Sequence, residues 1–221
     1  AGVASAMLVD ISPPLSPRTA VFPGDTPLSR RVLMDTASGD HLTLSTLTST
    51  VHVGSHADGE NHYKPGGRAI DEHALEVYLG PCVVAPVLAE GGQRFGLDAI
   101  DEKWLDALAV LVANGQPGRL LLHTGTGGSP ESFPNDLAAP EPAAIDALAE
   151  RGIRLLGVDT PSVDLADAKD LIGHAACARG GVFILEGLVL DGVEPGVWEL
   201  IALPLKLVGF DASPVRAVLR R

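Results

Sequence analysis

Three histidines and one aspartate lie within eleven consecutive residues, in the segment HVGSHADGENH. They are His52, His56, Asp58 and His62, and the whole chain has only 7 histidines. Imidazole nitrogens and carboxylate oxygens are ligands that Zn²⁺ and Mn²⁺ take in proteins. A metal ion with an open coordination position lowers the pKa of bound water to about 7 and makes a nucleophile available. The cluster therefore predicts metal-assisted hydrolysis, and the alternative is a polar loop with incidental histidines.

The spacing of these four residues indicates an extended backbone. Relative to His52 the offsets are 0, 4, 6 and 10, and because all are even, a strand would place every side chain on one face. A helix, at roughly 100° per residue, would divide them into two pairs on opposite sides. A straight strand would nevertheless separate His52 from His62 by roughly 33 Å. We therefore expect the chain to bend, and Gly54 and Gly59 are the residues that could permit the bend.

A site for two metal ions would need ligands from elsewhere in the chain. Glu186 is a candidate because it interrupts the apolar run GVFILEGLVL, where a carboxylate is costly unless it is paired or binds a metal. The alternative for Glu186 is the solvated side of an edge strand. His174 lies among apolar residues in DLIGHAACA, and taken alone it is more often a hydrogen-bonded core histidine than a ligand. The remaining candidates are His41, His73 and His123.

The composition indicates a globular protein that binds neither nucleic acid nor membranes. Of the 221 residues, 46% are hydrophobic, and a chain of this length can bury a substantial core. The formal net charge is −12, whereas nucleic acid and anionic membrane surfaces are bound by basic patches. A bound divalent ion would offset part of this negative charge.

The termini and cysteines favour a cytoplasmic location. No apolar run approaches the roughly 18 residues of a transmembrane helix. The start, AGVASAMLVDISPP, lacks the basic region and longer apolar stretch of a signal peptide. Residues 1–7, which do not begin with Met, are expected to be a disordered or vector-derived terminus. Cys82 and Cys177 are most simply reduced core residues.

The apolar patterning predicts one α/β domain over residues 1–221, in which strands dominate and much of the pairing is antiparallel. Helical periodicity with acidic residues near its start predicts a helix over 95–110. A second helix over 140–152 is expected to end at Gly152. The predicted strands are a short one at the start of MLVDISPP and the segments 42–53, 80–89, 119–125, 153–162, 181–190 and 198–207.

The pattern HxGxHxDxxxH, formed by His52, Gly54, His56, Asp58 and His62, resembles the metal motif of the cyclase-like metal-dependent amidohydrolases. Within that family the chain looks like the bacterial kynurenine formamidases (arylformamidases). The resemblance covers essentially the whole chain and is weakest from about residue 90 to 140. It also rests on the stretches DISPPLSPRTAVFPGDTP, YLGPC, GVDTPSVD and ILEGLVLDGVEPGVWELIALPLKLVGFDASPVRAVLR.

The resemblance implies a swivelling β/β/α fold with a mixed, largely antiparallel sheet, generally in homodimers. It also implies a site for two divalent ions, usually Zn²⁺, with Mn²⁺ as the alternative. His62 would be the proton donor and acceptor rather than a ligand, and Phe22 would contact the substrate. The implied ligands are His52, His56 and Asp58 for the first ion, and Asp58, His174 and Glu186 for the second, with Asp58 bridging and Glu186 a second candidate bridge.

The implied reaction is hydrolysis of N-formyl-L-kynurenine to L-kynurenine and formate, in tryptophan degradation. The alternatives are a related amide hydrolase, such as isatin hydrolase, and a catalytically silent metal-binding homologue. Glu60 and Asn61 replace the usual Pro-Leu before His62, so Glu60 could change the bend or add a competing ligand. Phe22 stands where the family usually has Trp, and the 123–135 loop also lacks a Trp. These departures concern the substrate more than the metal site.

Overall fold

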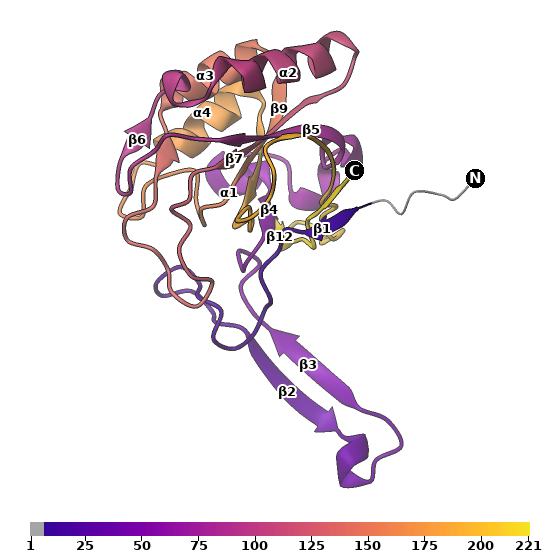
Figure 1. Ribbon diagram of the computed structural model, residues 1–221. Helices are drawn as coiled ribbons and strands as arrows, with labels where there is room; N and C mark the ends of the chain where they lie inside the picture. Colours follow the sequence, from indigo (N-terminus) through magenta and orange to yellow (C-terminus); the bar gives the residue numbers. More distant parts are fainter. Residues whose placement is uncertain (1–6) are drawn as a thin grey trace, which may run out of the picture.

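A nine-stranded mixed sheet forms the centre of the computed structural model, which describes residues 7–221 (Figure 1). Its strands are β1 (Leu8–Asp10), β4 (His56–Asp58), β5 (Leu79–Pro86), β7 (Gly118–His123), β9 (Ile153–Val158), β10 (Phe183–Glu186), β11 (Gly196–Ile201), β12 (Ala212–Pro214) and β13 (Val218–Arg220). Their order in the sheet is β1-β13-β11-β5-β7-β9-β10-β4-β12. Neighbours are parallel from β5 to β10 and antiparallel toward both edges. The predicted α/β fold with a mixed, largely antiparallel sheet is confirmed.

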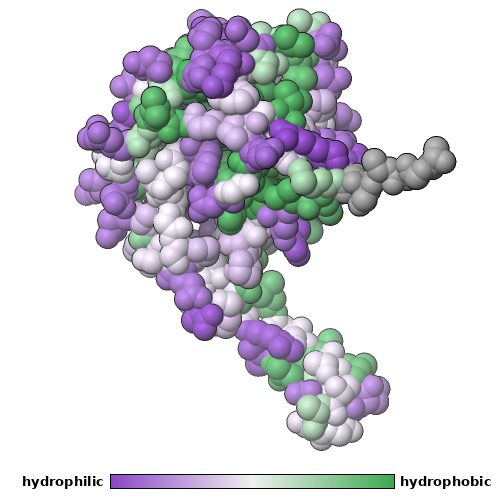
Figure 2. Space-filling model, viewed as in Figure 1, coloured by the Kyte–Doolittle hydropathy of each residue, from purple (hydrophilic) through white to green (hydrophobic). Residues whose placement is uncertain are grey.

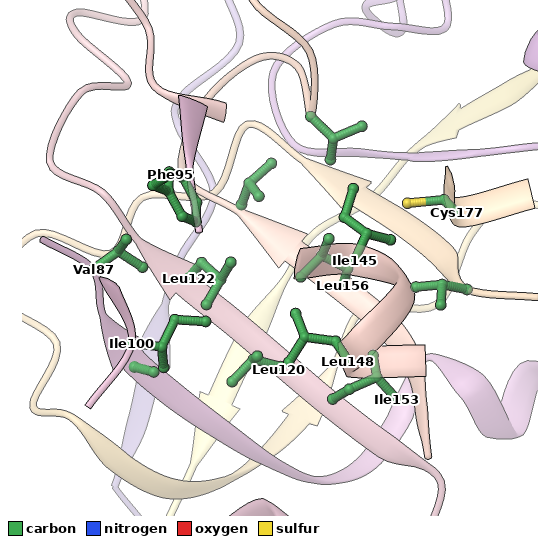
Figure 3. Packing of buried hydrophobic residues seen from close by; sticks show 14 of the residues in the cluster. Val87, Phe95, Ile100, Leu120, Leu122, Ile145, Leu148, Ile153, Leu156 and Cys177 are labelled. Atoms are coloured by element: carbon green, nitrogen blue, oxygen red, sulfur yellow. The ribbon is translucent and has the colours of Figure 1, made fainter. Parts of the chain in front are cut away.

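Three helices cover one face of this sheet, namely α2 (Glu102–Ala113), α3 (Pro142–Glu150) and α4 (Ile172–Gly180) (Figure 1). Side chains alternate between the two faces of a strand. Leu120 and Leu122 of β7 therefore pack against Ile145 and Leu148 of α3 (Figure 3), while Leu121 lies in a second apolar cluster on the opposite face. Because both faces of the central strands are covered, residues 120–122 (LLL) of β7 and 155–158 (LLGV) of β9 read as short continuous apolar runs.

Two short 3₁₀ turns, η2 (Ile70–Glu72) and η3 (Leu75–Val77), contribute Ile70 and Val77 to the second apolar cluster. This cluster also contains Tyr78, Trp198 and Leu200, all nearly inaccessible to solvent. Cys82 lies in this cluster and Cys177 in the first, and both are buried free thiols, as predicted. The remaining short helical elements are α1 (Glu60–Tyr63), η1 (Thr36–Ser38) and η4 (Leu97–Ala99), and side chains of α1 and η4 pack against the first cluster.

A β-hairpin extends from the body of the protein as an arm (Figure 1). It consists of β2 (Ser29–Met34) and β3 (Leu44–Thr48), paired antiparallel. The predicted strand over 42–53 is right only for β3, and β2 was not predicted. The segment SRRVLM has no solvent-protected face in the described structure, so its sequence carries no alternating apolar signal. A separate parallel pair is formed by β6 (Arg94–Phe95) and β8 (Ala139–Pro140).

The helix boundaries differ from the predicted ones for local reasons. The helix predicted over 95–110 begins only at Glu102, because the Asp101 side chain accepts a hydrogen bond from the backbone N–H of Lys103 and caps the first turn. The second predicted helix ends two residues before Gly152, whose φ of +90° is left-handed. Helix α4 was not predicted, because its sequence IGHAACARG shows little helical periodicity.

The sequence analysis expected residues 1–7 to be a disordered or vector-derived terminus, and residues 1–6 lie outside the described part of the chain. Met7, the first described residue, exchanges two backbone hydrogen bonds with Arg221, at 2.9 and 3.0 Å. Within residues 7–221, no helix combines the length and the apolar character needed to cross a membrane.

Candidate metal centre

The chain bends sharply between the arm and β4, and this bend closes the predicted cluster. Gly54 has a φ of +59°, and a Cβ there would meet the Leu15 side chain at 2.5 Å. Gly59 has an ordinary φ of −77°, but a Cβ there would come within 2.6 Å of Oδ1 of Asn61. Gly54 therefore supplies a left-handed backbone conformation, whereas Gly59 permits a close approach of the following residues.

Strand β4 presents two of the cluster residues on one face. His56 and Asp58 flank Ala57, so their side chains point the same way. The antiparallel register places Glu186 of β10 opposite His56, with Oε2 3.2 Å from Nε2 of the imidazole. Glu186 is only 3% exposed, so the alternative of a solvated edge position is wrong.

Three more histidines reach the same place from other elements. His52 lies in the bend, with Nδ1 3.3 Å from Oδ1 of Asp58. His174, on α4, has Nε2 3.5 Å from Oδ2 of Asp58. His62, on α1, has its ring centroid 4.2 Å from that of His52. The structure thus brings together six of the predicted site residues, which are His52, His56, Asp58, His62, His174 and Glu186.

Asp58 is the centre of the cluster, and its surroundings fit a bound cation. Oδ1 faces His52 and His56, whereas Oδ2 faces His174. Both oxygens are buried, and neither has a hydrogen-bond partner among residues 7–221. Burial alone raises the pKa of Asp58, yet the neighbouring His174 and His52 rings hold it well below its ordinary value. An ionised, buried and unsatisfied carboxylate is costly unless a cation compensates it. The donor set of imidazole nitrogens and carboxylates therefore fits a divalent transition metal.

The histidines differ in protonation. Burial lowers the pKa of His52, but contacts with Asp58 and Asp211 outweigh this effect and raise it to about 9. For His174, burial is likewise outweighed by Asp164 and Asp58, which raise its pKa to about 10. Burial lowers the pKa of His62, and the nearby His52 and His174 add to this effect. This lowered pKa favours the neutral form of His62.

Two carboxylates that the sequence analysis did not single out contact these histidines. Oδ2 of Asp211 lies 2.9 Å from Nε2 of His52. Oδ2 of Asp164 lies 2.8 Å from Nδ1 of His174. Both acids belong to stretches that carry the family resemblance, GFDASP and GVDTPSVD. Spacing gave no signal for the first pair, because 159 residues separate Asp211 from His52.

Three other candidate histidines lie outside the cluster. Nδ1 of His73 is hydrogen-bonded to the hydroxyl of Tyr78 at 2.8 Å, and its ring lies next to the second apolar cluster. His123 contacts Asp191 at 3.1 Å. His41 is exposed in the turn of the arm.

A cavity of about 370 Å³ opens onto the cluster. His62, His174 and Glu186 are among the residues that line it. Phe22 and Phe133 also line it, and their rings pack edge to face with centroids 5.6 Å apart. Phe22 therefore faces the cavity. Phe133 was not predicted, although it is the one aromatic side chain in the segment HTGTGGSPESFPN.

Glu60 does not join the cluster. Its Oε1 lies 2.7 Å from Nη2 of Arg68, and its Oε2 is 3.3 Å from Nε of the same side chain. Contact with this guanidinium lowers the pKa of Glu60 to about 2. The carboxylate is thus committed to Arg68, and the expectation that Glu60 could add a competing ligand is not supported by this geometry.

The fold and the buried cluster define a member of the cyclase family. A profile of the Cyclase family matches residues 9–165, and the chain belongs to this family. A kynurenine formamidase of Delftia acidovorans (strain DSM 14801 / SPH-1) is 42% identical over 213 residues, which are 96% of this chain and 97% of the relative. A kynurenine formamidase of Bordetella avium (strain 197N) matches with the same identity and coverage.

Solved structures share the fold at lower sequence identity. One, described as a potential metal-dependent hydrolase with cyclase activity, has a TM-score of 0.77 and 23% identity, over 98% of each chain. Isatin hydrolase A from Labrenzia aggregata has a TM-score of 0.77 and 21% identity, over 97% of this chain and 93% of its own. These likenesses concern the fold alone.

Proposed function

We propose that this chain is a metal-dependent kynurenine formamidase, which hydrolyses N-formyl-L-kynurenine to L-kynurenine and formate. The observation that carries the proposal is the buried cluster around Asp58, beside a cavity with an aromatic wall formed by Phe22 and Phe133. The substrate is supported by the two kynurenine formamidases that are 42% identical over 96% of this chain.

We assign two divalent ions to the cluster, with Zn²⁺ as the first choice and Mn²⁺ as the alternative. His52 and His56 would bind one ion together with Oδ1 of Asp58. His174 and Glu186 would bind the other together with Oδ2 of Asp58. This assignment is supported by the way in which each oxygen of Asp58 faces a different set of histidines. The two oxygens of Glu186 also face different histidines, with Oε2 3.2 Å from Nε2 of His56 and Oε1 3.6 Å from Nε2 of His174. Glu186 is therefore a second candidate bridge.

Bound divalent ions would supply Lewis acidity toward the formyl oxygen and a water nucleophile near neutral pH. His62 is proposed to manage the protons. As the water oxygen bonds to the formyl carbon, His62 accepts a proton from that water. An aryl amine leaves poorly as an anion, so His62 returns the proton to nitrogen as the C–N bond breaks. The products are the free amine and formic acid, which ionises to formate. The near-neutral ordinary pKa of imidazole suits both transfers.

The aromatic wall is proposed to receive the aryl ring of the substrate. Phe22 and Phe133 form an edge-to-face pair on the cavity lining, and such faces pack well against another ring. The cavity of about 370 Å³ is within the range of small-molecule sites. Two phenylalanines would then replace the wider Trp surface that the family usually provides.

We further propose a cytoplasmic homodimer that forms through the arm. A two-stranded hairpin alone is marginally stable in water, and this arm stands away from the body of the protein (Figure 1). Apolar side chains lie on its surface (Figure 2), and those with large exposed fractions are Val32, Leu33, Leu42, Leu44 and Leu47. The unpaired Cys82 and Cys177 are compatible with a reducing compartment.

The test is steady-state hydrolysis of N-formyl-L-kynurenine by zinc-loaded protein, by chelator-stripped protein and by stripped protein given zinc again. We expect activity to disappear on stripping and to return with zinc. Isatin is assayed in parallel. Faster turnover of isatin would favour the related amide hydrolase. Absence of turnover in protein that contains zinc would favour a silent metal-binding homologue.

A further inference from the structure

We propose that Asp164, held in turn by Arg94, is a positioning residue that fixes His174 for one of the two ions. The inference rests on the proposed metal site and adds to it two residues that are not ligands. It assigns a function to the short β6–β8 pair, which carries Arg94 and lies apart from the central sheet.

Asp164 is fully buried, and both of its oxygens are engaged. Oδ1 lies 2.5 Å from Nη2 of Arg94 and accepts a hydrogen bond from the backbone N–H of Gly173 at 2.8 Å. Oδ2 lies 2.8 Å from Nδ1 of His174 and accepts from the backbone N–H of that residue at 3.1 Å. Asp58 is equally buried, but neither of its oxygens has a hydrogen-bond partner among the described residues. The two carboxylates therefore differ in what they can do: Asp58 can still bind an ion, whereas Asp164 is occupied in holding the helix that carries His174.

The contact at Nδ1 determines which nitrogen of His174 is available. A carboxylate at Nδ1 keeps a proton on that atom, so when His174 gives up its other proton to bind an ion, the lone pair that it offers is on Nε2. Nε2 is the nitrogen that faces the cluster, 3.5 Å from Oδ2 of Asp58 and 3.6 Å from Oε1 of Glu186. Carboxylates that hold metal-binding histidines in this way also fix the orientation of the ring.

The residue before Asp164 orients the neighbouring ligand. The backbone N–H of Val163 donates a hydrogen bond to Oε1 of Glu186 at 2.8 Å. Two consecutive residues thus hold two of the proposed ligands. The close packing depends on Gly173, because a Cβ there would come within 2.5 Å of the Val163 carbonyl oxygen and 3.0 Å of Oδ1 of Asp164.

Arg94 compensates the charge that this arrangement buries. Without its guanidinium, the buried carboxylate of Asp164 would face only the His174 ring and the backbone N–H groups of Gly173 and His174. Arg94 is itself anchored, since Nη1 donates to the carbonyl oxygen of Pro140 in β8 at 3.0 Å. Its side chain is only 16% exposed. The Asp164 contacts are therefore preorganised on the His174 side of the cluster.

The experiment compares zinc binding by the wild-type chain with that of Asp164→Asn and Arg94→Met. The matched control is Asp146→Asn, which disrupts the ion pair with Arg179 of α4 (2.9 Å) without touching His174. Zinc per chain and the affinity of each ion are measured by chelator competition, and ¹⁵N NMR reports the tautomer of His174. We expect two ions in the wild type and the control. In both test variants, one ion should bind about 10–100-fold more weakly, and the Nδ1–H tautomer should be less populated.

Unchanged affinity for both ions together with an unchanged tautomer in the test variants would overturn the inference. An equal loss in Asp146→Asn would also overturn it, because the cause would then be the packing of α4. If Asp164→Asn fails to fold, Arg94→Met decides. If the wild type binds fewer than two ions, the two-ion assignment fails separately, and the tautomer of His174 in the variants decides the inference.

Discussion

The carboxylate of Asp211 lies 2.9 Å from Nε2 of His52. The same oxygen is 3.7 Å from Nδ1 of His62. Since Nε2 of His52 faces Asp211, it is Nδ1 that faces Asp58. The pairing of β12 with β4 brings Asp211 close to the cluster, because Ala212, the next residue after Asp211, lies opposite Asp58 in the sheet. One carboxylate thus lies between a proposed ligand and the proposed proton carrier.

Asp211→Ala is expected to weaken zinc binding on the His52 side by about 10–100-fold and to lower activity over a similar range. The physical reason is that the imidazole of His52 loses the partner that orients it. The measurements are zinc affinity by chelator competition and kcat on N-formyl-L-kynurenine. Asp191→Ala is the control, because it removes a carboxylate 3.1 Å from Nε2 of His123, outside the cluster. Unchanged zinc affinity in Asp211→Ala would show that this contact does not support the site.

Asp58→Ala is expected to lose both ions. Its two oxygens face different sets of histidines, so its removal takes a ligand from each proposed ion. Zinc per chain after dialysis is measured by mass spectrometry, and circular dichroism establishes that the variant is folded. Retention of one tightly bound ion would mean that Asp58 serves a single ion, and retention of two would refute its role as a ligand.

His62→Ala is expected to keep both ions and to lose roughly 10²–10⁴-fold in kcat, the usual contribution of a positioned acid–base group. Zinc content is the decisive control, because the distances also allow His62 to bind a metal together with Asp58 and His174. His123→Ala is the matched variant, since that imidazole is similarly exposed but lies outside the cluster. Loss of an ion from His62→Ala would reassign His62 as a ligand.

The parts of the fold that sequence could predict are those whose burial leaves a pattern. Strands β7 and β9 are buried on both faces from Leu120 and Leu155 onward, and each contains a continuous apolar run there. Strand β2 is exposed almost throughout, so its apolar and basic residues follow no period. Helix α4 was missed because two glycines and His174 interrupt its apolar face.

The candidate site likewise contains residues that the sequence reveals and contacts that only the fold brings about. His52, His56, Asp58 and His62 share one short segment, so the cluster was visible before any fold was known. The extended backbone predicted for all four is nevertheless right only for His56 and Asp58, because His52 lies in the bend and His62 on α1. Asp211 approaches His52 only because β12 pairs with β4, and a sequence does not reveal strand neighbours 159 residues apart. The contact that commits Glu60 to Arg68 likewise depends on a loop conformation.

Glu60→Pro is expected to leave kcat unchanged or to improve it. Glu60 is the first residue of α1, a position that proline tolerates, and Gly59 before it has the extended backbone that proline requires of its predecessor. The exposed pair with Arg68 contributes only about 0.2–1 kcal/mol. Steady-state kinetics and thermal unfolding are the measurements, and Arg68→Ala shows the effect of losing the pair alone. A collapse of activity in Glu60→Pro, with Arg68→Ala normal, would mean that the Glu60 carboxylate has acquired a function.

Arg119 of β7 is 1% exposed and donates hydrogen bonds to four backbone carbonyls. Two of the distances are 2.8 Å to Val77 and 3.0 Å to Pro81. The other acceptors are the carbonyl oxygens of Pro117 and Glu76. Burial lowers the pKa of Arg119. The guanidinium therefore satisfies a group of carbonyls that would otherwise be buried without a donor.

Arg119→Met is expected to lower the free energy of unfolding by about 1–3 kcal/mol for each carbonyl that stays buried without a partner. Urea unfolding measures the change. The control is Arg220→Met, which removes an exposed ion pair with Glu199 (2.6 Å) and should cost no more than about 1 kcal/mol. Equal losses in the two variants would mean that water replaces the guanidinium at these carbonyls, and that Arg119 contributes no more than a surface arginine.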